Sequence, residues 1–143
     1  MLLTPHFTLD EMTVSQVAAR EGLDNTPAQA VIDNLRLLCT TLEQVRALLA
    51  APIIISSAYR SEPLNRLVGG AAGSQHVQGL AADFTVDGLS PRDTVRLIST
   101  SSIAFDQLIL EFDKWVHMSV TAGVPRRQVL TLRDESGYLP GLV

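Results

Sequence analysis

The chain has one cysteine, few basic residues and no long apolar run, and each shortage excludes a class of protein. Its single cysteine, Cys39, excludes an intramolecular disulfide, and its place in a helical stretch predicts a small buried core residue. With 11 Lys and Arg against 15 Asp and Glu, the net charge is −4. This balance argues against nucleic-acid binding, which needs clustered basic residues. No stretch reaches the ~20 apolar residues of a transmembrane helix, so no membrane insertion is expected.

The start of the chain gives no sign of export. Residues 1–6 lack the charged segment and the apolar run of a signal peptide. We therefore expect synthesis in the cytoplasm, with delivery by other means if the target lies outside the cell. The length of 143 residues and the hydrophobic content of 46% predict one domain, 1–143, with a sizeable core. No feature indicates an oligomeric state.

The first third of the chain is predicted to be helical after an irregular lead-in over residues 4–12. A capping box formed by Thr13 and Gln16 predicts a short helix over about residues 14–21, and Gly22 follows at the position of a C-terminal glycine.

A longer helix should follow, with Thr26 as its N-cap and Pro27 at its first position. Apolar residues recur every three or four positions through 31–49, and Pro52 ends the pattern. Two successive helices also resemble a helix-turn-helix. However, the second begins without Arg or Lys and carries Asp33, which would repel phosphates. Helices that pack on a sheet account for the pattern better.

The remainder of the chain contains mainly strand signals. Short β-branched or apolar runs predict strands at 53–59, 80–86, 108–110, 115–120 and 129–132. One or two helical turns are expected within 60–68, a glycine loop over 69–73, a helix over about 90–99, and a loose tail over 133–143, in which Tyr138 and Leu139 are docking points. Because helices come first and strands dominate later, the order predicts an α+β fold with helices packed on a mostly antiparallel sheet.

Two histidines and an aspartate form a candidate metal site. His76 and Asp83 are seven positions apart, which suits one ligand on the loop entering a strand and another inside that strand. His117, on a neighbouring strand, would complete the set. Two His and one carboxylate leave a fourth position for water on tetrahedral zinc. The alternative is that the histidines are hydrogen-bonded core or surface residues and that Asp83 pairs with Arg60 or Arg66.

Three separated motifs resemble a known family. They are Ser57-Ala58-Tyr59-Arg60-Ser61, Ser74-x-His76-x-x-Gly79-x-Ala81-x-Asp83 and Trp115-Val116-His117. Together they are similar to the zinc D-Ala-D-Ala carboxypeptidases, a family that includes the vancomycin-resistance dipeptidases and the L-alanyl-D-glutamate endopeptidases of phage endolysins. The resemblance extends over about residues 7–120 and is strongest to short phage and prophage members. It implies a small, hedgehog-type α+β domain with helices against an antiparallel sheet.

The resemblance also implies roles for individual residues. His76, Asp83 and His117 correspond to the zinc ligands of the family. Arg60 corresponds to the cation that steadies the substrate carbonyl or the developing oxyanion, a task that suits a fixed guanidinium. Ser74 is implied to hydrogen-bond the substrate or a ligand.

The general base departs from the family pattern. Many members carry a glutamate three residues before the last histidine ligand, and Lys114 occupies that position here. Two carboxylates lie nearby, Glu111 and Asp113. We favour Glu111 because its side chain reaches further and because it follows Gln-Leu-Ile in a context similar to short phage members. Asp113 remains the alternative base. If Asp113 has no catalytic role, we expect it to be a turn residue of a hairpin. Trp115 is expected either to wall the cleft or to fill the core.

The resemblance implies a zinc-dependent peptidase that hydrolyses an amide bond in the peptide of bacterial peptidoglycan. The bond is D-Ala-D-Ala, cut by a carboxypeptidase, L-Ala-D-Glu, cut by an endolysin-like endopeptidase, or a cross-bridge bond, and the sequence does not distinguish them. A phage holin or a phage particle would bring such an enzyme to the wall. The departure at Lys114 keeps an alternative open, a non-catalytic zinc-binding or phage structural module of the same fold.

Overall fold

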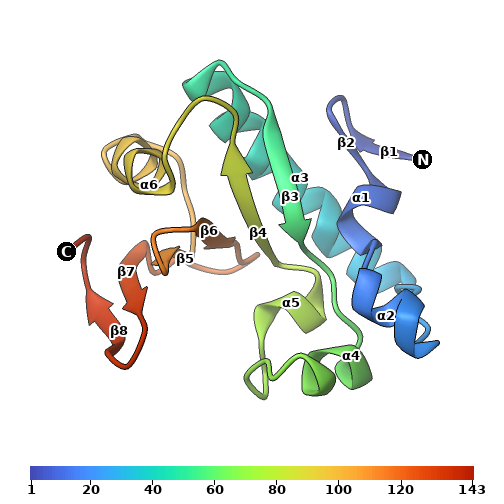
Figure 1. Ribbon diagram of the computed structural model, residues 1–143. Helices are drawn as coiled ribbons and strands as arrows, with labels where there is room; N and C mark the ends of the chain where they lie inside the picture. The colour runs from blue at the N-terminus through green and yellow to red at the C-terminus, as the bar shows by residue number, and fades with distance from the viewer.

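A six-stranded sheet forms the centre of the computed structural model, which describes all 143 residues (Figure 1). Its strands, in spatial order, are β3 (Ile53–Ser57), β4 (Ala81–Val86), β6 (Trp115–Ser119), β5 (Gln107–Glu111), β7 (Gln128–Arg133) and β8 (Gly137–Pro140). All neighbours are antiparallel except β5 and β7, which run parallel. The predicted α+β fold with a mostly antiparallel sheet is confirmed.

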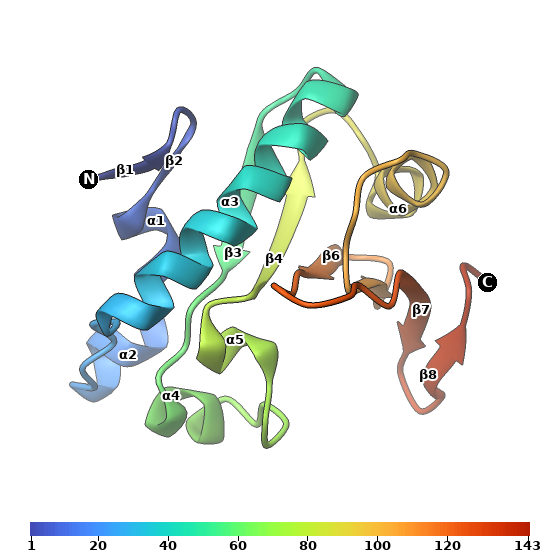
Figure 2. The same ribbon diagram turned by 180° about the vertical axis from the view of Figure 1, so that it is seen from behind.

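Six helices accompany the sheet. They are α1 (Leu9–Thr13), α2 (Gln16–Glu21), α3 (Gln29–Leu49), α4 (Glu62–Leu67), α5 (Gln75–Gln78) and α6 (Pro91–Ser99). The long α3 lies in front of β3 and β4 in the view of Figure 2, and the shorter α6 packs against α3 and the central strands. A small separate sheet pairs β1 (Leu2–Thr4) with β2 (Phe7–Thr8). None of the helices combines the length and apolarity needed to cross a membrane.

One face of the sheet is buried against these helices. The α3 stripe of Leu35, Leu38, Leu42 and Val45 is fully buried, as the spacing of three and four predicts, and Cys39 lies among them. Alternate residues of the central strands complete this core: Ala82, Phe84 and Val86 on β4, Val116 and Met118 on β6, and Leu108 and Leu110 on β5. Because side chains alternate along a strand, the intervening residues point to the opposite face. That opposite face carries the candidate site.

The N-terminal segment is more regular than predicted. Residues 4–12 were expected to be irregular, but they contribute to β1, β2 and α1. The capping box is formed by Thr8 and Glu11, whose side chains each accept a hydrogen bond from the other's backbone N–H. Thr13 instead donates to the carbonyl of Leu9 within α1, and Ser15 caps α2. The prediction of a Thr13 capping box was therefore wrong, although Gly22 ends α2 in the left-handed region as expected.

The long helix begins two residues later than its N-cap prediction. Ala28 is the N-cap and makes no side-chain cap bond, while the Thr26 backbone donates to the Asp24 carboxylate in a local turn. The helix ends at Leu49, with Ala50 in the left-handed region. The predicted end of this helix is confirmed and its predicted cap is wrong.

The tail over residues 133–143 was predicted to be loose, and this prediction was wrong. The chain turns over residues 134–136 and pairs with β7 as β8, with Tyr138 opposite Leu132 and Leu139 opposite Thr131. A four-residue strand is too short to show a reliable alternation in sequence. The unpaired edge of β7 supplies the hydrogen-bonding partners that make this strand form.

Candidate metal centre and cleft

Three elements bring the predicted metal ligands together. His76 lies on α5, Asp83 on β4 and His117 on β6, and Asp83 and His117 are directly opposite each other in the sheet register. One ligand atom from each residue lies within 4.8 Å of the others. The structure therefore brings together the three side chains that the sequence singled out.

His76 lies on a short helix and not on a loop, which corrects the prediction. The Ser74 hydroxyl accepts from the backbone N–H of His76 at 3.2 Å, and Gly79 ends the helix at φ +77°. A Cβ atom at Gly79 would lie 2.8 Å from a methyl carbon of Val31 on α3. Glycine is thus needed both for the left-handed turn and for the close approach that seats α5 on α3.

The hydrogen bonds of His76 determine which of its nitrogens faces the site. Nδ1 lies 2.6 Å from the carbonyl oxygen of Ala58, and a carbonyl can only accept, so Nδ1 carries a hydrogen. In the neutral ring, the lone pair is then on Nε2, which faces Oδ2 of Asp83 at 3.4 Å. Two acceptor atoms thus face each other, an arrangement that a metal ion bound to both would stabilise.

The same carboxylate also contacts the second histidine, since Oδ1 of Asp83 is 3.0 Å from Nδ1 of His117. Although burial alone would raise the pKa of Asp83, hydrogen bonds from His117 and His76 hold that pKa well below its usual range. The carboxylate is therefore ionised at the centre of the cluster. Donor atoms of a tetrahedral zinc site with bonds near 2.1 Å lie about 3.4 Å apart, which is close to the spacings here. The residues present fit a zinc ion.

Glu111 lies beside this cluster at the end of β5. One of its carboxylate oxygens accepts from the indole N–H of Trp115 at 3.0 Å. Burial, followed by the negative charge of Asp83, raises the pKa of Glu111 above its usual value. Trp115 is part-buried, packs beside Phe112 and is not part of the hydrophobic core. Its indole holds the Glu111 carboxylate in place.

Asp113 takes a different position. It lies in the β5–β6 hairpin at φ +54°, and its carboxylate accepts two hydrogen bonds of 3.2 Å from Arg92 on α6. Its side chain is half exposed. Lys114 lies in the same turn and is exposed. The structure therefore places Glu111 near the His-Asp-His cluster and ties Asp113 to another surface.

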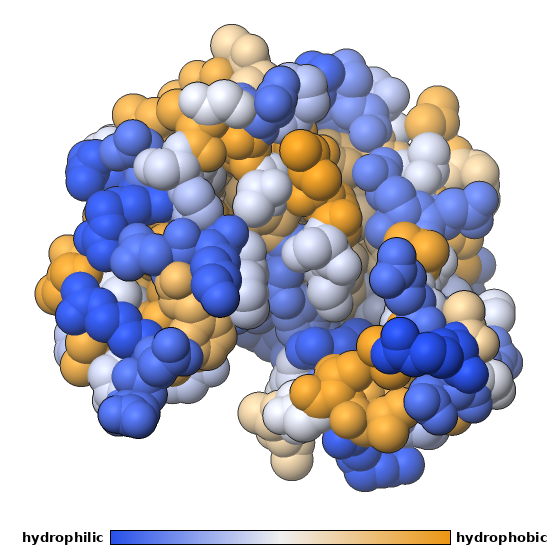
Figure 3. All heavy atoms as spheres, in the orientation of Figure 1, coloured by the Kyte–Doolittle hydropathy of each residue, from blue (hydrophilic) through white to orange (hydrophobic).

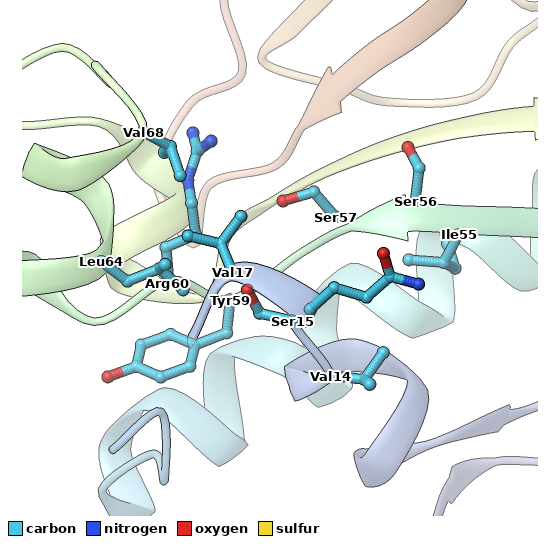
Figure 4. Close-up of a pocket in the computed structure, with 11 residues that line it drawn as sticks. Val14, Ser15, Val17, Ile55, Ser56, Ser57, Tyr59, Arg60, Leu64 and Val68 are labelled. Carbon is cyan, nitrogen blue, oxygen red and sulfur yellow. The ribbon is translucent and has the colours of Figure 1, made fainter. Parts of the chain in front are cut away.

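Arg60 follows β3 and is joined to the site through its backbone, whose N–H donates to the carbonyl of His76 at 3.1 Å. Burial lowers the pKa of its guanidinium, and the charges of Asp83 and Glu111 oppose that shift. The guanidinium makes no hydrogen bond or ion pair within the chain, and its Nε is buried without a partner. It borders a cavity of ≈ 600 Å³ between α2, β3 and α4, where it extends away from the Tyr59 ring (Figure 4).

A second cavity of ≈ 370 Å³ lies beside the cluster, with His117 in its lining. Its floor is formed by Gln107, Ile109, Glu111 and His117, one wall by residues 71–75, and the other wall by Arg126, Leu130 and Tyr138. Figure 3 shows the molecule hollowed by a deep notch between the β7–β8 and α4–α5 regions. We call this hollow the cleft. Ser74 lines it, in addition to capping α5.

Several residues that line the cleft or support its lining were not predicted from the sequence. Asp106 is a buried carboxylate that accepts hydrogen bonds from the Arg126 side chain and backbone and from Gln75, the neighbour of His76. The Arg126 hydrogen bonds, more than the opposing effect of burial, lower the pKa of Asp106 to about 2. Tyr138 reaches the cleft only because β8 forms. The only sequence signal for Asp106 was an aspartate close to a predicted strand within an otherwise apolar segment. Tyr138 had no signal for a place in the cleft, and the sequence predicted it only as a docking point of the tail.

The comparisons with known proteins agree with this geometry. No curated protein matches the chain. A family model described as Peptidase M15 matches residues 5–119, which include the three candidate ligands, Arg60 and Glu111. The match covers most of the chain and confirms the family resemblance drawn from the three motifs. This protein belongs to the Peptidase M15 family of zinc peptidases.

Proposed function

We propose that this peptidase hydrolyses an amide bond in the stem peptide of bacterial peptidoglycan and that it uses zinc held by His76, Asp83 and His117. The observation that carries the proposal is the His-Asp-His cluster at the edge of a cleft whose floor also presents Glu111. Membership of the Peptidase M15 family supports the peptidase activity.

When bound, zinc would polarise the substrate carbonyl and lower the pKa of a coordinated water to about 7. The donor set supports this ion over Mg²⁺ or Ca²⁺, which prefer oxygen ligands. The bond from His76 Nδ1 to the Ala58 carbonyl acts as the orienting contact that metal-ligating histidines ordinarily have.

Glu111 is the proposed general base. It would accept a proton from the attacking water and pass that proton to the leaving amine. Its raised pKa suits this exchange, because a base near the working pH can both accept and release a proton. The ion pair of Asp113 with Arg92 supports the choice of Glu111 over Asp113.

Arg60 is the proposed oxyanion-stabilising cation, and Ser74 a proposed substrate contact. The Arg60 guanidinium has no partner in the chain and lies within electrostatic range of Asp83 and Glu111. A free guanidinium beside the reacting centre can bind the carbonyl oxygen as negative charge develops on it. The Ser74 hydroxyl lies at the rim of the cleft, where an extended peptide would pass.

Of the candidate bonds, D-Ala-D-Ala, L-Ala-D-Glu and a cross-bridge bond, we favour the first two. A phage holin or virion is the proposed route to the wall. To test the activity, purified peptidoglycan is incubated with the zinc-loaded protein, and new amino termini are labelled and identified by mass spectrometry. We expect new D-alanine, or new amino-terminal D-glutamate, to accumulate with time and to stop when the metal is chelated. If no new termini appear with a fully zinc-loaded chain, the catalytic proposal is wrong.

The alternative, a non-catalytic module of the same fold, rests on one observation, the lysine at position 114. Lys114 is an exposed turn residue, and Glu111 supplies a carboxylate beside the cluster from three positions earlier. The same experiment separates the two functions, because a structural module would bind zinc and release no amino termini.

A further inference from the structure

The β7–β8 hairpin extends the face of the sheet that carries the site. Glu111 on β5 is paired with Leu132 on β7, which is paired with Tyr138 on β8. Paired residues on neighbouring strands project from the same face of a sheet. Tyr138 therefore lies on the same face as Glu111, two strand spacings or about 10 Å away along the hydrogen-bonding direction.

The surroundings of Tyr138 are those of a cleft residue. It lines the cleft together with Glu111, His117 and Leu130. Partial burial, followed by the negative charges of Glu111 and Asp83, raises the pKa of its phenol above the usual value. The hydroxyl is therefore protonated at neutral pH and available as a hydrogen-bond donor toward the cleft.

A purely structural role accounts poorly for this tyrosine. Tyr138 is 59% exposed, its hydroxyl makes no hydrogen bond within the chain, and its ring is not part of the hydrophobic core. Its neighbour Leu139 points to the other face and is less exposed, which suffices to hold β8 on the sheet. An exposed aromatic ring with an unused donor, set at the wall of a cleft, is typical of ligand-binding sites.

We propose that Tyr138 is a substrate-binding residue of this peptidase. Its ring forms the wall of the cleft opposite residues 71–75, and its hydroxyl donates a hydrogen bond to an oxygen of the bound peptide. The inference rests on the proposed function, since it assumes that the cleft holds a wall peptide. Tyr138 lies outside residues 5–119, which match the family.

The test compares Tyr138→Phe, which removes only the hydroxyl, with Tyr138→Ala, which also removes the ring. Tyr59→Phe is the matched control, because it makes the same change at the other tyrosine of the chain, whose hydroxyl points away from Arg60 (Figure 4). We expect Tyr138→Phe to lower kcat/KM on a soluble stem pentapeptide about tenfold, chiefly through KM, as loss of one hydrogen bond implies. Tyr138→Ala should lower it further, and Tyr59→Phe should leave it unchanged.

Binding is measured as well as turnover, so that failure of this inference is distinct from failure of the proposed function. The affinity of the stem pentapeptide for the zinc-loaded Glu111→Gln protein is measured by calorimetry, with and without Tyr138→Phe. About tenfold weaker binding, at unchanged zinc content and Tm, supports the role of Tyr138 even if no hydrolysis is found. The role of Tyr138 is overturned if the proteins with and without Tyr138→Phe have equal affinity and equal kcat/KM. It is also overturned if the substitution lowers zinc content or Tm in parallel, since that would show a structural role. Absence of any pentapeptide binding to either protein overturns it as well.

Discussion

Asp83 and His117 occupy directly opposed positions on β4 and β6, and their side chains meet with Oδ1 3.0 Å from Nδ1. Neighbouring strands are spaced by about 4.8 Å, so a pair of opposed residues delivers two ligand atoms to one point without any loop having to order. Only His76 has to be positioned by a separate element, the short helix α5, which Ser74 and Gly79 cap at its two ends. Two of the three side chains of the candidate metal site are thus held by the central sheet.

Asp83→Asn should abolish stoichiometric zinc binding. The amide is neutral, so it cannot offset the charge of the ion between the two histidines. The purified wild-type protein should contain about one zinc per chain, as expected for a site with three protein ligands. The zinc content of the Asp83→Asn protein should be a small fraction of this value. Asp113→Asn is the control, since that carboxylate pairs with Arg92 instead. Full zinc content in Asp83→Asn would contradict the assigned ligand set.

Zinc should also stabilise the native state. A ligand that binds only the folded chain adds about 2.7 kcal/mol when its free concentration is ~100 times its Kd. The Tm measured by calorimetry should therefore rise on zinc addition and fall with a chelator. The Asp83→Asn protein should show neither shift, and a shift of wild-type size in that variant would place the ion elsewhere.

Glu111→Gln should lower kcat by about 10²–10⁴, the range typical of a general base, and should retain zinc. Asp113→Asn should stay within about twofold of wild type, because its contact with Arg92 is exposed and worth little. Steady-state kinetics and metal analysis of both variants check this. The reverse pattern would make Asp113 the base.

Trp115→Phe should shift the acidic limb of the kcat/KM profile to higher pH. Burial and the charge of Asp83 raise the pKa of Glu111, and the hydrogen bond from the Trp115 indole opposes that rise. Removing the indole N–H leaves the ionised carboxylate less stabilised, so the pKa rises further and more alkaline conditions are needed to ionise the base. The measurement is kcat/KM against pH at constant zinc saturation. An unmoved or acid-shifted limb would argue against Glu111 as the titrating group.

Gly79→Ala should damage the site far more than Gly73→Ala, although both glycines have nearly the same positive φ, +77° and +76°. A Cβ at Gly73 meets nothing within 4 Å, so its substitution costs only the left-handed backbone, about 1–2 kcal/mol. At Gly79 the Cβ would also clash with Val31, which adds about 1–3 kcal/mol and displaces α5. Urea unfolding and zinc affinity measure the two effects, and equal losses in both variants would refute the packing argument.

Asp106→Asn should lower stability at neutral pH by about 1–3 kcal/mol, because hydrogen bonds from Arg126 and Gln75 lose their charged acceptor. The pKa of Asp106 is about 2 in the folded chain, below the ordinary value of 3.8. The contribution of the ionised Asp106 carboxylate to the free energy of unfolding is therefore fully present above pH 3.8 and is lost as the pH falls toward 2. The difference between wild type and variant should narrow over that interval in urea unfolding. A difference independent of pH would exclude the ionised carboxylate as its source.

Regular features of the fold could be predicted from local signals. The apolar stripe of α3 and the β-branched run of β3 follow directly from period and propensity. The helix predicted over about residues 90–99 is confirmed as α6, with Ser90 as its N-cap and Pro91 at its first position. The predictions failed at the first cap, where Thr8 and not Thr13 forms the capping box, and at the short strand β8. At the first cap the competing signals are both local, whereas β8 forms because it pairs with β7.

The sequence alone determined the candidate ligand types, their order in the chain and the family, because His76, Asp83 and His117 keep their metal-binding chemistry wherever they lie. Tertiary structure decided which other groups join them. Glu111 and Asp113 are two residues apart, yet the turn sends one into the cleft and the other to Arg92. Tyr138 shares a face with Glu111 because β8 pairs with its neighbour β7 and because β7 pairs with β5, a strand well separated from it in the sequence. Long-range pairing is set by the summed packing and hydrogen bonding of the whole sheet, and no local pattern encodes that sum.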